Sequence, residues 1–310
     1  MRVVGYSPDM LERVAFVVEE REKGVRLNRF LRARMPHLPA KSVRFAIGAG
    51  DVTVNGQPGA KGRFLQEGDR VSIRKIAEGT DWLPEKGDPP GASVLYEDGV
   101  VAILNKPPDV HTEPHRPREA GTLAGFLLAR FPFVSEISSA PGLTLLTRLD
   151  YSTSGAVPAA LTGEALSFLS REREQGRIRK VYFCVVAGRM RGKMVLSGRI
   201  ESEGGETVRV RVDRADPDPG RWTTITPVLE GERCTLVRAE IVRGKRHQIR
   251  AHLAAAGFPV VGDRRYSAVP DEGPGRGRLL LHAGEVEFVH PETGERVRVV
   301  SPLPGEFLVT

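Results

Sequence analysis

The chain has 310 residues, 40% of them hydrophobic and 27% charged, a composition that favours a globular protein of two domains. Its two cysteines lie far apart, so we expect no disulfide framework and no metal site. No apolar run reaches 18 residues, so we expect no membrane span. Acids stand where a signal peptide would have its apolar centre, so we expect no secretory signal and a cytoplasmic location. The net charge of +7 suits nucleic acid as a partner and equally an inert basic surface.

A first, small α/β domain is expected over residues 1–78. Apolar residues recur at helical spacing within 27–35, where Asn28 is placed to cap a helix, and again within 41–50. Basic residues are interleaved through both helices and form either a solvated face or a docking face for RNA phosphates. The candidates for RNA contact are Arg29, Lys41 and Arg44.

Two strands complete this domain. DVTVNG (51–56) alternates like a strand and ends in an Asn-Gly turn signal, and GDRVSI (68–73) reads as a second strand. Residues 79–91 are rich in Pro, Gly and acids and are expected to be a linker. The second domain is then expected over 92–310.

Strands dominate this second domain and do not alternate regularly with helices. SVLYEDGVVAIL (93–104) predicts two strands around an Asp-Gly turn, and LTLLTRLD (143–150) predicts a strand running into a loop. Further strands are expected over 181–188, 206–213, 223–229, 235–242, 279–290 and 296–302. Helices are expected over 121–131, over 162–174 with Thr162 as cap, and over 245–257, ended by Gly257. The pattern favours an α+β fold with a mixed, largely antiparallel sheet and helices packed beside it.

TRLDYSTSG (147–155) places Asp150 directly after an apolar segment. An aspartate there is usually a turn or cap residue, but the Ser and Thr residues that follow already supply that chemistry. Arg148 is a nearby cation. A carboxylate at a strand end can also act as nucleophile or general base, so both interpretations stay open.

RGKRHQIRAHL (243–253) brings Arg246 and Arg250 together as an i,i+4 pair of like charge, which slightly destabilises a helix unless an anion is near. That anion is either an RNA phosphate or a carboxylate from elsewhere in the fold. A basic face in solvent is the alternative. It accounts less well for His247 and Gln248, whose side chains can bind polar edges of bases.

Three further residues allow two interpretations each. Tyr182 lies inside an apolar run, as a core residue or as a ring that stacks on a base. Lys106, in LNKPPDV (104–110), either binds phosphate or is solvated. Asp263 follows Gly262, and there a structural turn is the better interpretation.

Together and in this order, these stretches resemble the RluA-type family of RNA pseudouridine synthases over nearly the whole chain. TRLDYSTSG is similar to the family signature H-R-L-D-x-x-T-S-G, and RGKRHQIRAH to its G-R-x-H-Q-I-R-x-H segment. The matching segments are LYEDGVVAILNKPPDVHTEPH (95–115), TRLDYSTSG (147–155), RKVYFCVVAG (179–188), RGKRHQIRAHLAAAGFPVVGDRRY (243–266) and LLLHAGEVEFVHPETGE (279–295).

The resemblance implies the pseudouridine synthase fold and the isomerisation of uridine to pseudouridine in RNA, with no cofactor and no metal. Asp150 matches the catalytic aspartate, Tyr182 the tyrosine that stacks on the target base, and Arg250 the basic residue paired with the carboxylate. Arg148 matches the arginine that enters the RNA helix as the uridine leaves it. Whether Asp150 attacks the base or assists loss of a sugar proton stays open.

The sequence departs from the family in several places. Thr147 replaces the histidine of the signature, and Tyr151 and Ser152 replace residues that are typically charged. Arg243 stands where threonine is common, and Lys245 replaces an arginine. The alternative function is therefore a catalytically silent RNA-binding protein in ribosome assembly.

The resemblance extends to the first domain and to the substrate. Residues 26–75 are similar to the ribosomal-protein-S-four-type RNA-binding module that often precedes this catalytic domain. With that module, large-subunit ribosomal RNA is the first expectation and transfer RNA the second. A monomer is the default expectation.

Overall fold

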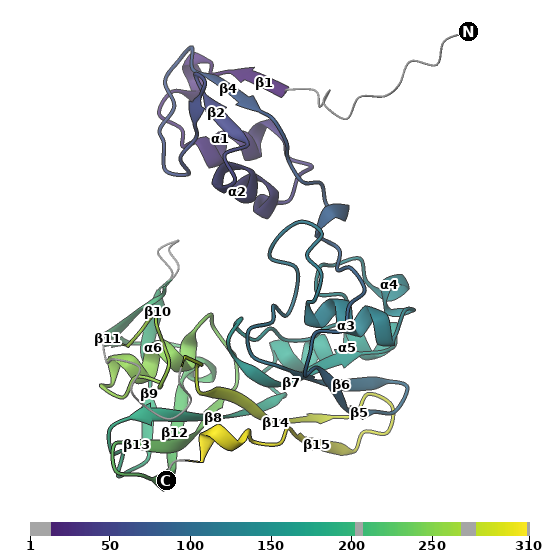
Figure 1. Cartoon of the computed structure of the whole chain (residues 1–310), viewed down its shortest axis with the longest axis vertical. Helices are drawn as coiled ribbons and strands as arrows, with labels where there is room; N and C mark the ends of the chain where they lie inside the picture. Colours follow the sequence, from purple (N-terminus) through teal and green to yellow (C-terminus); the bar gives the residue numbers. More distant parts are fainter. Residues whose placement is uncertain (1–13, 202–206, 268–276, 309–310) are drawn as a thin grey trace. The chain divides into compact units, whose positions relative to one another are not determined.

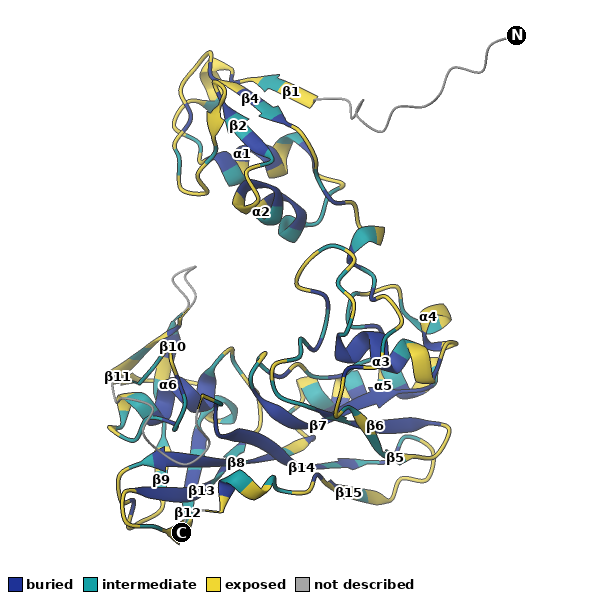
Figure 2. Cartoon of the chain, in the orientation of Figure 1, coloured by how far each residue is buried: buried dark blue, intermediate teal, exposed yellow. Residues whose placement is uncertain are grey.

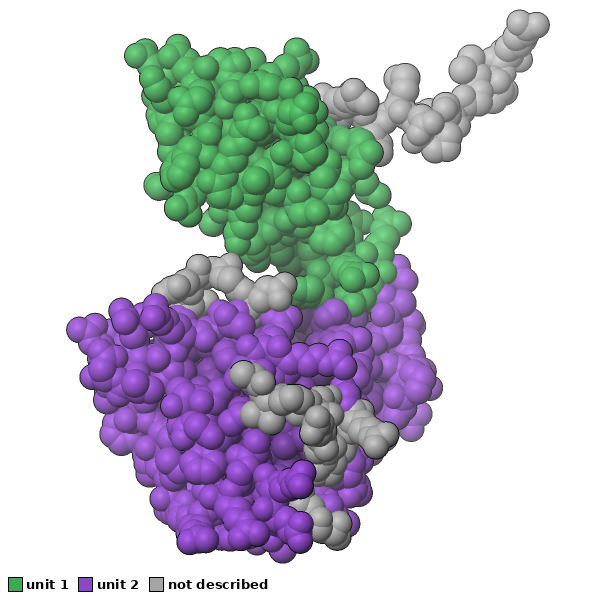
Figure 3. Space-filling view, turned by 60° about the vertical axis from the view of Figure 1, so that its left-hand side comes forward, with its two compact units in different colours: residues 1–83, 115–119 green, residues 84–114, 120–310 purple. Residues whose placement is uncertain are grey.

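The computed structural model describes residues 14–201, 207–267 and 277–308, which form two compact units (Figure 3). Unit 1 contains the described residues up to Leu83 together with His115–Glu119, and unit 2 contains Pro84–Pro114 and the described residues from Ala120 on. Most of the segment used to judge a signal peptide lies outside the described residues. So does Glu206, the first residue of one predicted strand.

Unit 1 packs two helices, α1 (Leu27–Arg34) and α2 (Ala40–Gly48), with one antiparallel sheet (Figure 1). The sheet has the order β1 (Val14–Val17), β4 (Arg70–Ile73), β2 (Val52–Val54) and β3 (Gln57–Pro58). The predicted Asn-Gly turn joins β2 to β3, with positive φ at Asn55 and Gly56, as a tight hairpin requires. Apolar residues of both helices and of β2 and β4 form its core.

The predicted cap at Asn28 is wrong. Helix α1 begins at Leu27, after Arg26 in an extended conformation, so Asn28 is already its second residue and has no capping role. The start is set from outside the helix, because Leu27 N–H donates to the carbonyl of Arg63 at 2.9 Å and Arg26 forms a β-bridge with Phe64.

Two short 3-10 helices, Glu20–Glu22 and Thr80–Trp82, also belong to unit 1. The second lies in the segment predicted as a linker. Its Trp82 is buried and donates its indole N–H to the Ser42 hydroxyl of α2 at 2.8 Å.

Unit 2 is built on one large sheet whose described strands pair antiparallel except for β7 with β14, which are parallel. The strand order is β5 (Ser93–Glu97), β6 (Val101–Lys106), β7 (Ser154–Ala160), β14 (Leu281–Val289), β8 (Arg179–Ala187), β13 (Cys234–Ile241), β12 (Thr223–Glu230) and β9 (Met194–Leu196), and β15 (Arg296–Val300) pairs with β14. Figure 2 shows the middle strands β7, β8 and β14 buried along most of their length. The expected mixed, largely antiparallel sheet is confirmed.

Helices lie beside the two halves of this sheet. Figure 1 shows α3 (Leu123–Arg130), α4 (Val134–Ile137) and α5 (Gly163–Glu174) near β5–β7. Helix α6 (Gln248–Ala255) lies near β12 and a separate hairpin of β10 (Gly198–Glu201) and β11 (Arg209–Ala215). The predicted cap is confirmed in α5, where the Thr162 hydroxyl accepts the Ala165 N–H at 3.1 Å. Two further 3-10 turns cover Pro219–Arg221 and Gly305–Phe307.

The strand predicted over 143–150 is absent from the described structure, where Leu145 makes one isolated bridge with Ala159 of β7. Leu146 N–H donates to the Pro158 carbonyl at 2.8 Å, but proline has no N–H to return. The Leu146 carbonyl instead accepts from the Arg173 guanidinium at 2.6 Å. The pairing therefore stops, and the chain continues as a loop to Asp150.

No helix within the described ranges is both long and apolar enough to cross a membrane.

Candidate active site

Asp150 lies in the loop that leads into β7, and its two neighbours are held by hydrogen bonds. The Thr112 hydroxyl accepts the Leu149 N–H at 3.1 Å and donates to the Leu149 carbonyl at 2.9 Å. On the other side, Lys106 Nζ donates to the Tyr151 carbonyl at 2.9 Å. The backbone is thus fixed on both sides of Asp150, whose own carboxylate is 25% exposed.

One guanidinium joins Asp150 to a second carboxylate. Arg250 Nη1 donates to Asp150 Oδ2 at 2.8 Å, while Arg250 Nε and Nη2 form a bidentate pair with Asp263 at 2.7 and 2.8 Å. Burial alone would lower the pKa of Arg250, but the two carboxylates outweigh it and raise that pKa above its ordinary value. Arg250 is therefore a permanent cation beside Asp150.

Asp263 is the buried member of this trio. Burial opposes its charged form, but the bonds from Arg250 and from the N–H groups of Arg265 and Tyr266 hold its pKa below the ordinary value. The pair fixes the Arg250 fork in one orientation, because bidentate arginine–carboxylate geometry is planar. That orientation aims the remaining Nη1 at Asp150.

Helix α6, which carries Arg250, is pinned at its start. Gln248 is buried and donates its amide to the Arg221 carbonyl at 2.8 Å and to the Thr223 hydroxyl at 3.1 Å. One turn later, His252 bonds the same Thr223 hydroxyl at 2.8 Å and the Gly198 carbonyl at 2.8 Å. These contacts tie the helix to β12 and β10.

His247 precedes α6 in a left-handed conformation, with φ 57°. Its Nδ1 lies 2.9 Å from the Tyr266 hydroxyl and its Nε2 lies 3.8 Å from Asp150 Oδ1. Burial, together with the cations Arg250, Arg246 and Arg265, lowers the pKa of His247 in spite of Asp150. A neutral imidazole therefore borders the carboxylate at neutral pH.

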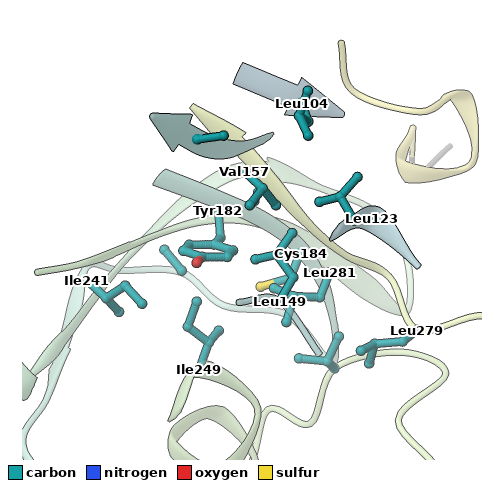
Figure 4. Packing of buried hydrophobic residues seen from close by; sticks show 14 of the residues in the cluster. Leu104, Leu123, Leu149, Val157, Tyr182, Cys184, Ile241, Ile249, Leu279 and Leu281 are labelled. Carbon is teal, nitrogen blue, oxygen red and sulfur yellow. The ribbon is translucent and has the colours of Figure 1, made fainter. Parts of the chain in front are cut away.

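Tyr182, on β8, borders the same site from the core. Its strand neighbours in register are Ala239 of β13 and Ala283 of β14, which are both small. Figure 4 shows the ring among Ile241, Leu149 and Ile249, members of the same buried cluster. Burial, and secondarily the charge of Asp150, raises the pKa of Tyr182, so it stays a neutral phenol. The site thus presents a carboxylate, a fixed guanidinium and an aromatic ring.

Comparison with known proteins identifies the family. The family model described as RNA pseudouridylate synthase matches residues 100–255. This range holds Asp150, Tyr182 and Arg250, and it covers half of the chain. The chain belongs to the RNA pseudouridylate synthase family. It is therefore an isomerase that acts on RNA.

Two relatives show how far the similarity reaches. "Uncharacterized RNA pseudouridine synthase YhcT" of Bacillus subtilis is 31% identical over 265 residues, covering 82% of each chain. "Ribosomal large subunit pseudouridine synthase D" of Neisseria meningitidis serogroup A is 29% identical over 311 residues, covering 95% of this chain and 80% of the relative.

A solved structure supports the fold assignment. "Human RNA Pseudouridylate Synthase Domain Containing 1" matches with a TM-score of 0.56 and 26% identity, over 70% of this chain and 86% of that one. With the family match, this shows that the large sheet of unit 2 has the pseudouridine synthase fold, of mixed α and β content and mostly sheet.

Two residues predicted to bind RNA have other partners in the enzyme. Lys106 is fully buried and donates to three carbonyls, those of Pro107 at 2.9 Å, Val110 at 2.6 Å and Tyr151. Burial lowers the pKa of this ammonium to about 7, opposed by the carboxylates of Asp109 and Asp150. Contrary to the prediction, Lys106 is not available to a phosphate. Its role is to hold the Asp150 loop.

Gln248 also differs from its prediction. Its side-chain oxygen accepts the Lys245 N–H at 2.9 Å and its amide binds backbone and Thr223, so no polar edge is left for a base. By contrast, Arg148 is 73% exposed and pairs with Glu113 at 2.7 Å. Arg246 is exposed and lies two residues before α6, with its Nη2 3.4 Å from the Thr207 carbonyl.

The predicted cations of unit 1 lie on its helices. Arg29 on α1 and Arg44 on α2 are exposed. Lys41 is half-buried, with its ammonium 4.2 Å from the centre of the Trp82 ring. Within the described ranges, no group of three or more His, Cys, Asp and Glu side chains could hold a metal ion.

Asp263 is the site residue that the sequence analysis missed. The expected turn is real, since its Oδ1 accepts the backbone N–H of Arg265 at 3.0 Å. The signal for its second role was the like-charge pair of Arg246 and Arg250, which indicated a nearby anion, either an RNA phosphate or a carboxylate from elsewhere in the fold. Nothing in the spacing distinguished Asp263 from other aspartates as that partner.

Two departures from the family pattern have structural partners. Lys245 bonds Asp216 at 2.9 Å, and Arg243 bonds Asp218 at 2.9 Å. Both aspartates follow β11, so these pairs join the base of the β10–β11 hairpin to the segment before α6.

Proposed function

We propose that this enzyme converts uridine to pseudouridine in large-subunit ribosomal RNA, with Asp150 as its catalytic carboxylate. The observation that carries the proposal is the guanidinium of Arg250 held between Asp263 and Asp150. The Tyr182 phenol lies within reach of the Asp150 charge. The ribosomal substrate is supported by relatives named ribosomal large subunit pseudouridine synthase C and D.

The reaction breaks the bond between N1 of uracil and C1′ of ribose and forms a bond from C5 to C1′. N1 gains a proton and C5 loses its hydrogen to solvent, so the atoms balance without an oxidant or reductant. A base inside a duplex cannot be reached, so the uridine is flipped out at a cost of a few kcal/mol. Stacking on Tyr182 recovers part of this cost, and Arg148 fills the gap left in the RNA.

The role of Asp150 follows from its chemical setting. It is an acceptor-only group whose one fixed partner, Arg250 Nη1, binds Oδ2 and leaves Oδ1 facing His247. Because Arg250 is also bound to Asp263, it cannot turn away when the carboxylate reacts. The carboxylate is therefore preorganised against a flipped base.

We further propose that unit 1 is an S-four-type RNA-binding module within 1–78, followed by a linker at 79–91 and the catalytic domain over 92–310. The exposed cations Arg29 and Arg44 support RNA contact by its helices. Lys41 and Arg246 remain candidates for the same task. We also propose that the enzyme is cytoplasmic and monomeric and that it uses no metal.

The experiment is pseudouridine mapping of total RNA from cells with and without this gene. The proposal predicts that one or a few sites in large-subunit ribosomal RNA are lost and are restored by the wild-type gene but not by Asp150→Ala. Loss of sites only in transfer RNA would overturn the ribosomal substrate. No lost site, with no activity of the purified enzyme on deproteinised ribosomal RNA, would favour the silent RNA-binding protein.

A further inference from the structure

Two loops of unit 2 are joined residue by residue next to Asp150. The rings of His111 and Tyr151 lie 4.6 Å apart between centroids, tilted by 53°. Next to them, Thr112 and Leu149 form two hydrogen bonds, and Glu113 and Arg148 form an ion pair. We call the joined residues the loop platform: His111, Thr112, Glu113, Arg148, Leu149 and Tyr151.

Tyr151 is the exposed ring of this loop platform. It is 48% exposed, and in the described part of unit 2 Phe133 is the other exposed aromatic side chain. Its backbone is fixed nevertheless, because Lys106 holds its carbonyl. A ring that is exposed, immobilised at its backbone and adjacent to Asp150 is poised to meet the substrate rather than to fill the core.

The charges around this ring suit RNA. Arg148, three residues earlier in the chain, is exposed and pairs with Glu113 in the facing loop. A surface ion pair of this kind is weak, so an RNA phosphate can compete for the guanidinium. An exposed cation and an exposed aromatic ring on one loop are a combination that binds single-stranded nucleic acid.

We propose that Tyr151 stacks on the base of the nucleotide next to the target uridine, which makes it a determinant of RNA recognition. This inference rests on the proposed role of Asp150 as the reacting group. When the uridine leaves its stack, its neighbours lose a stacking partner, and the ring adjoining Asp150 lies where such a base is exposed. Tyr151 replaces a residue that is typically charged in the family, so the contact is a feature of this chain.

The test compares Tyr151→Ala and Tyr151→Phe with wild type and with Phe133→Ala, which removes the other exposed ring. The substrate is a synthetic RNA spanning the uridine that the wild-type enzyme modifies. Two further versions carry an abasic ribose in place of its 5′ or its 3′ neighbour. Initial rates give KM and kcat for each combination.

We expect Tyr151→Ala to raise KM about tenfold on the intact RNA, the loss of one base–aromatic stack, with kcat within about twofold. Tyr151→Phe and Phe133→Ala stay near wild type. On one of the two abasic RNAs, wild type and Tyr151→Ala become equal, because the stacking partner is already gone.

Two results overturn the inference. One is an equal loss by Tyr151→Ala on the intact and on both abasic RNAs, which would mean that the ring only supports His111. The other is no loss on any RNA. Failure of the proposed function looks different, since the wild-type enzyme would then form no pseudouridine on the intact RNA.

Discussion

At the scale of single residues, the proposed chemistry depends on how Arg250 is held. Asp263 is buried and binds two of its nitrogens, whereas Asp150 is partly exposed and binds one. The exposed carboxylate is free to meet a substrate, and the buried one fixes the cation that supports it. Asp263 is thus a positioning residue for Asp150.

Asp263→Asn removes the charge that fixes Arg250 while keeping the size of the side chain. We expect kcat to fall about 10- to 100-fold, because a misaligned group near the reacting atoms costs about two orders of magnitude. The free energy of unfolding falls by about 3 kcal/mol, since a buried pair is broken. Single-turnover rates and thermal unfolding measure both.

The matched control is Asp51→Asn, which breaks the Asp51–Arg74 pair of unit 1, whose arginine is 67% exposed. Neither the rate nor the stability changes appreciably there, because exposed pairs contribute little. Wild-type kcat in Asp263→Asn would show that Arg250 needs no second carboxylate.

His282 predicts a pH dependence of stability. It is buried on β14, with Nδ1 2.9 Å from the Ser154 hydroxyl, and burial lowers its pKa from 6.5 to about 4. Between these values the unfolded chain binds the proton more readily, so stability is full above about pH 6.5 and falls as the pH is lowered. From about pH 7.5 to about pH 5 this group accounts for a loss of about 2 kcal/mol.

Urea unfolding of wild type and His282→Gln at both pH values isolates this contribution. The variant loses less stability than wild type between them, because glutamine does not titrate. An identical pH dependence in the two proteins would mean that His282 is not kept neutral by the fold.

At the scale of elements, the parallel contact of β7 with β14 positions the Asp150 loop. Gly155 of β7 has φ 114°, and a Cβ atom there would lie 2.2 Å from the Ala283 carbonyl oxygen. Only glycine allows the two strands to approach this closely. The approach also brings Ser154 to His282.

The substitution Gly155→Ala therefore pushes β7 away from β14. We expect the free energy of unfolding to fall by about 3 kcal/mol or more, with a loss of activity. Alanine is strained at this φ, and its Cβ collides with backbone atoms that cannot move aside. Gly163→Ala at the start of α5 is the control, since its Cβ would meet open space. A stable Gly155→Ala enzyme would disprove the close approach.

Local signals predicted many of the elements. The Asn-Gly turn at 55–56 and the Thr162 cap are decided by residues adjacent in sequence, and both were predictable. The loop conformation of segment 143–150 was not predictable, because its pairing depends on Pro158 of β7 and on Arg173 of α5. Asp150 and Arg250 were found by resemblance to a family, while the buried roles of Lys106 and Gln248 depend on carbonyls that no spacing reveals.

At the scale of the whole molecule, most of the net charge of +7 belongs to unit 1, which has 17 Lys and Arg residues against 11 Asp and Glu. In the proposal, unit 2 holds the catalytic carboxylate. Unit 1 carries exposed cations on α1 and α2, which we propose bind RNA phosphates. Such contacts release counterions and are visible as salt dependence.

Changing Arg29 and Arg44 together to glutamine tests this division. The slope of log affinity against log salt is expected to become shallower by about 1.5, the effect of two lost phosphate contacts, with kcat unchanged. Arg74→Gln is the control, because this exposed arginine follows β4 and does not belong to α1 or α2. An unchanged slope in the double variant would mean that these helices do not touch RNA phosphates.

The central claim is that Asp150 carries out the isomerisation. The most direct measurement is tritium release from ribosomal RNA labelled at C5 of its uridines, since this hydrogen leaves only when C5 becomes the glycosidic carbon. We predict release by wild type and none by Asp150→Asn, with the affinity for RNA nearly the same in both. Comparable release by Asp150→Asn would contradict the account, because another group would then carry the reaction.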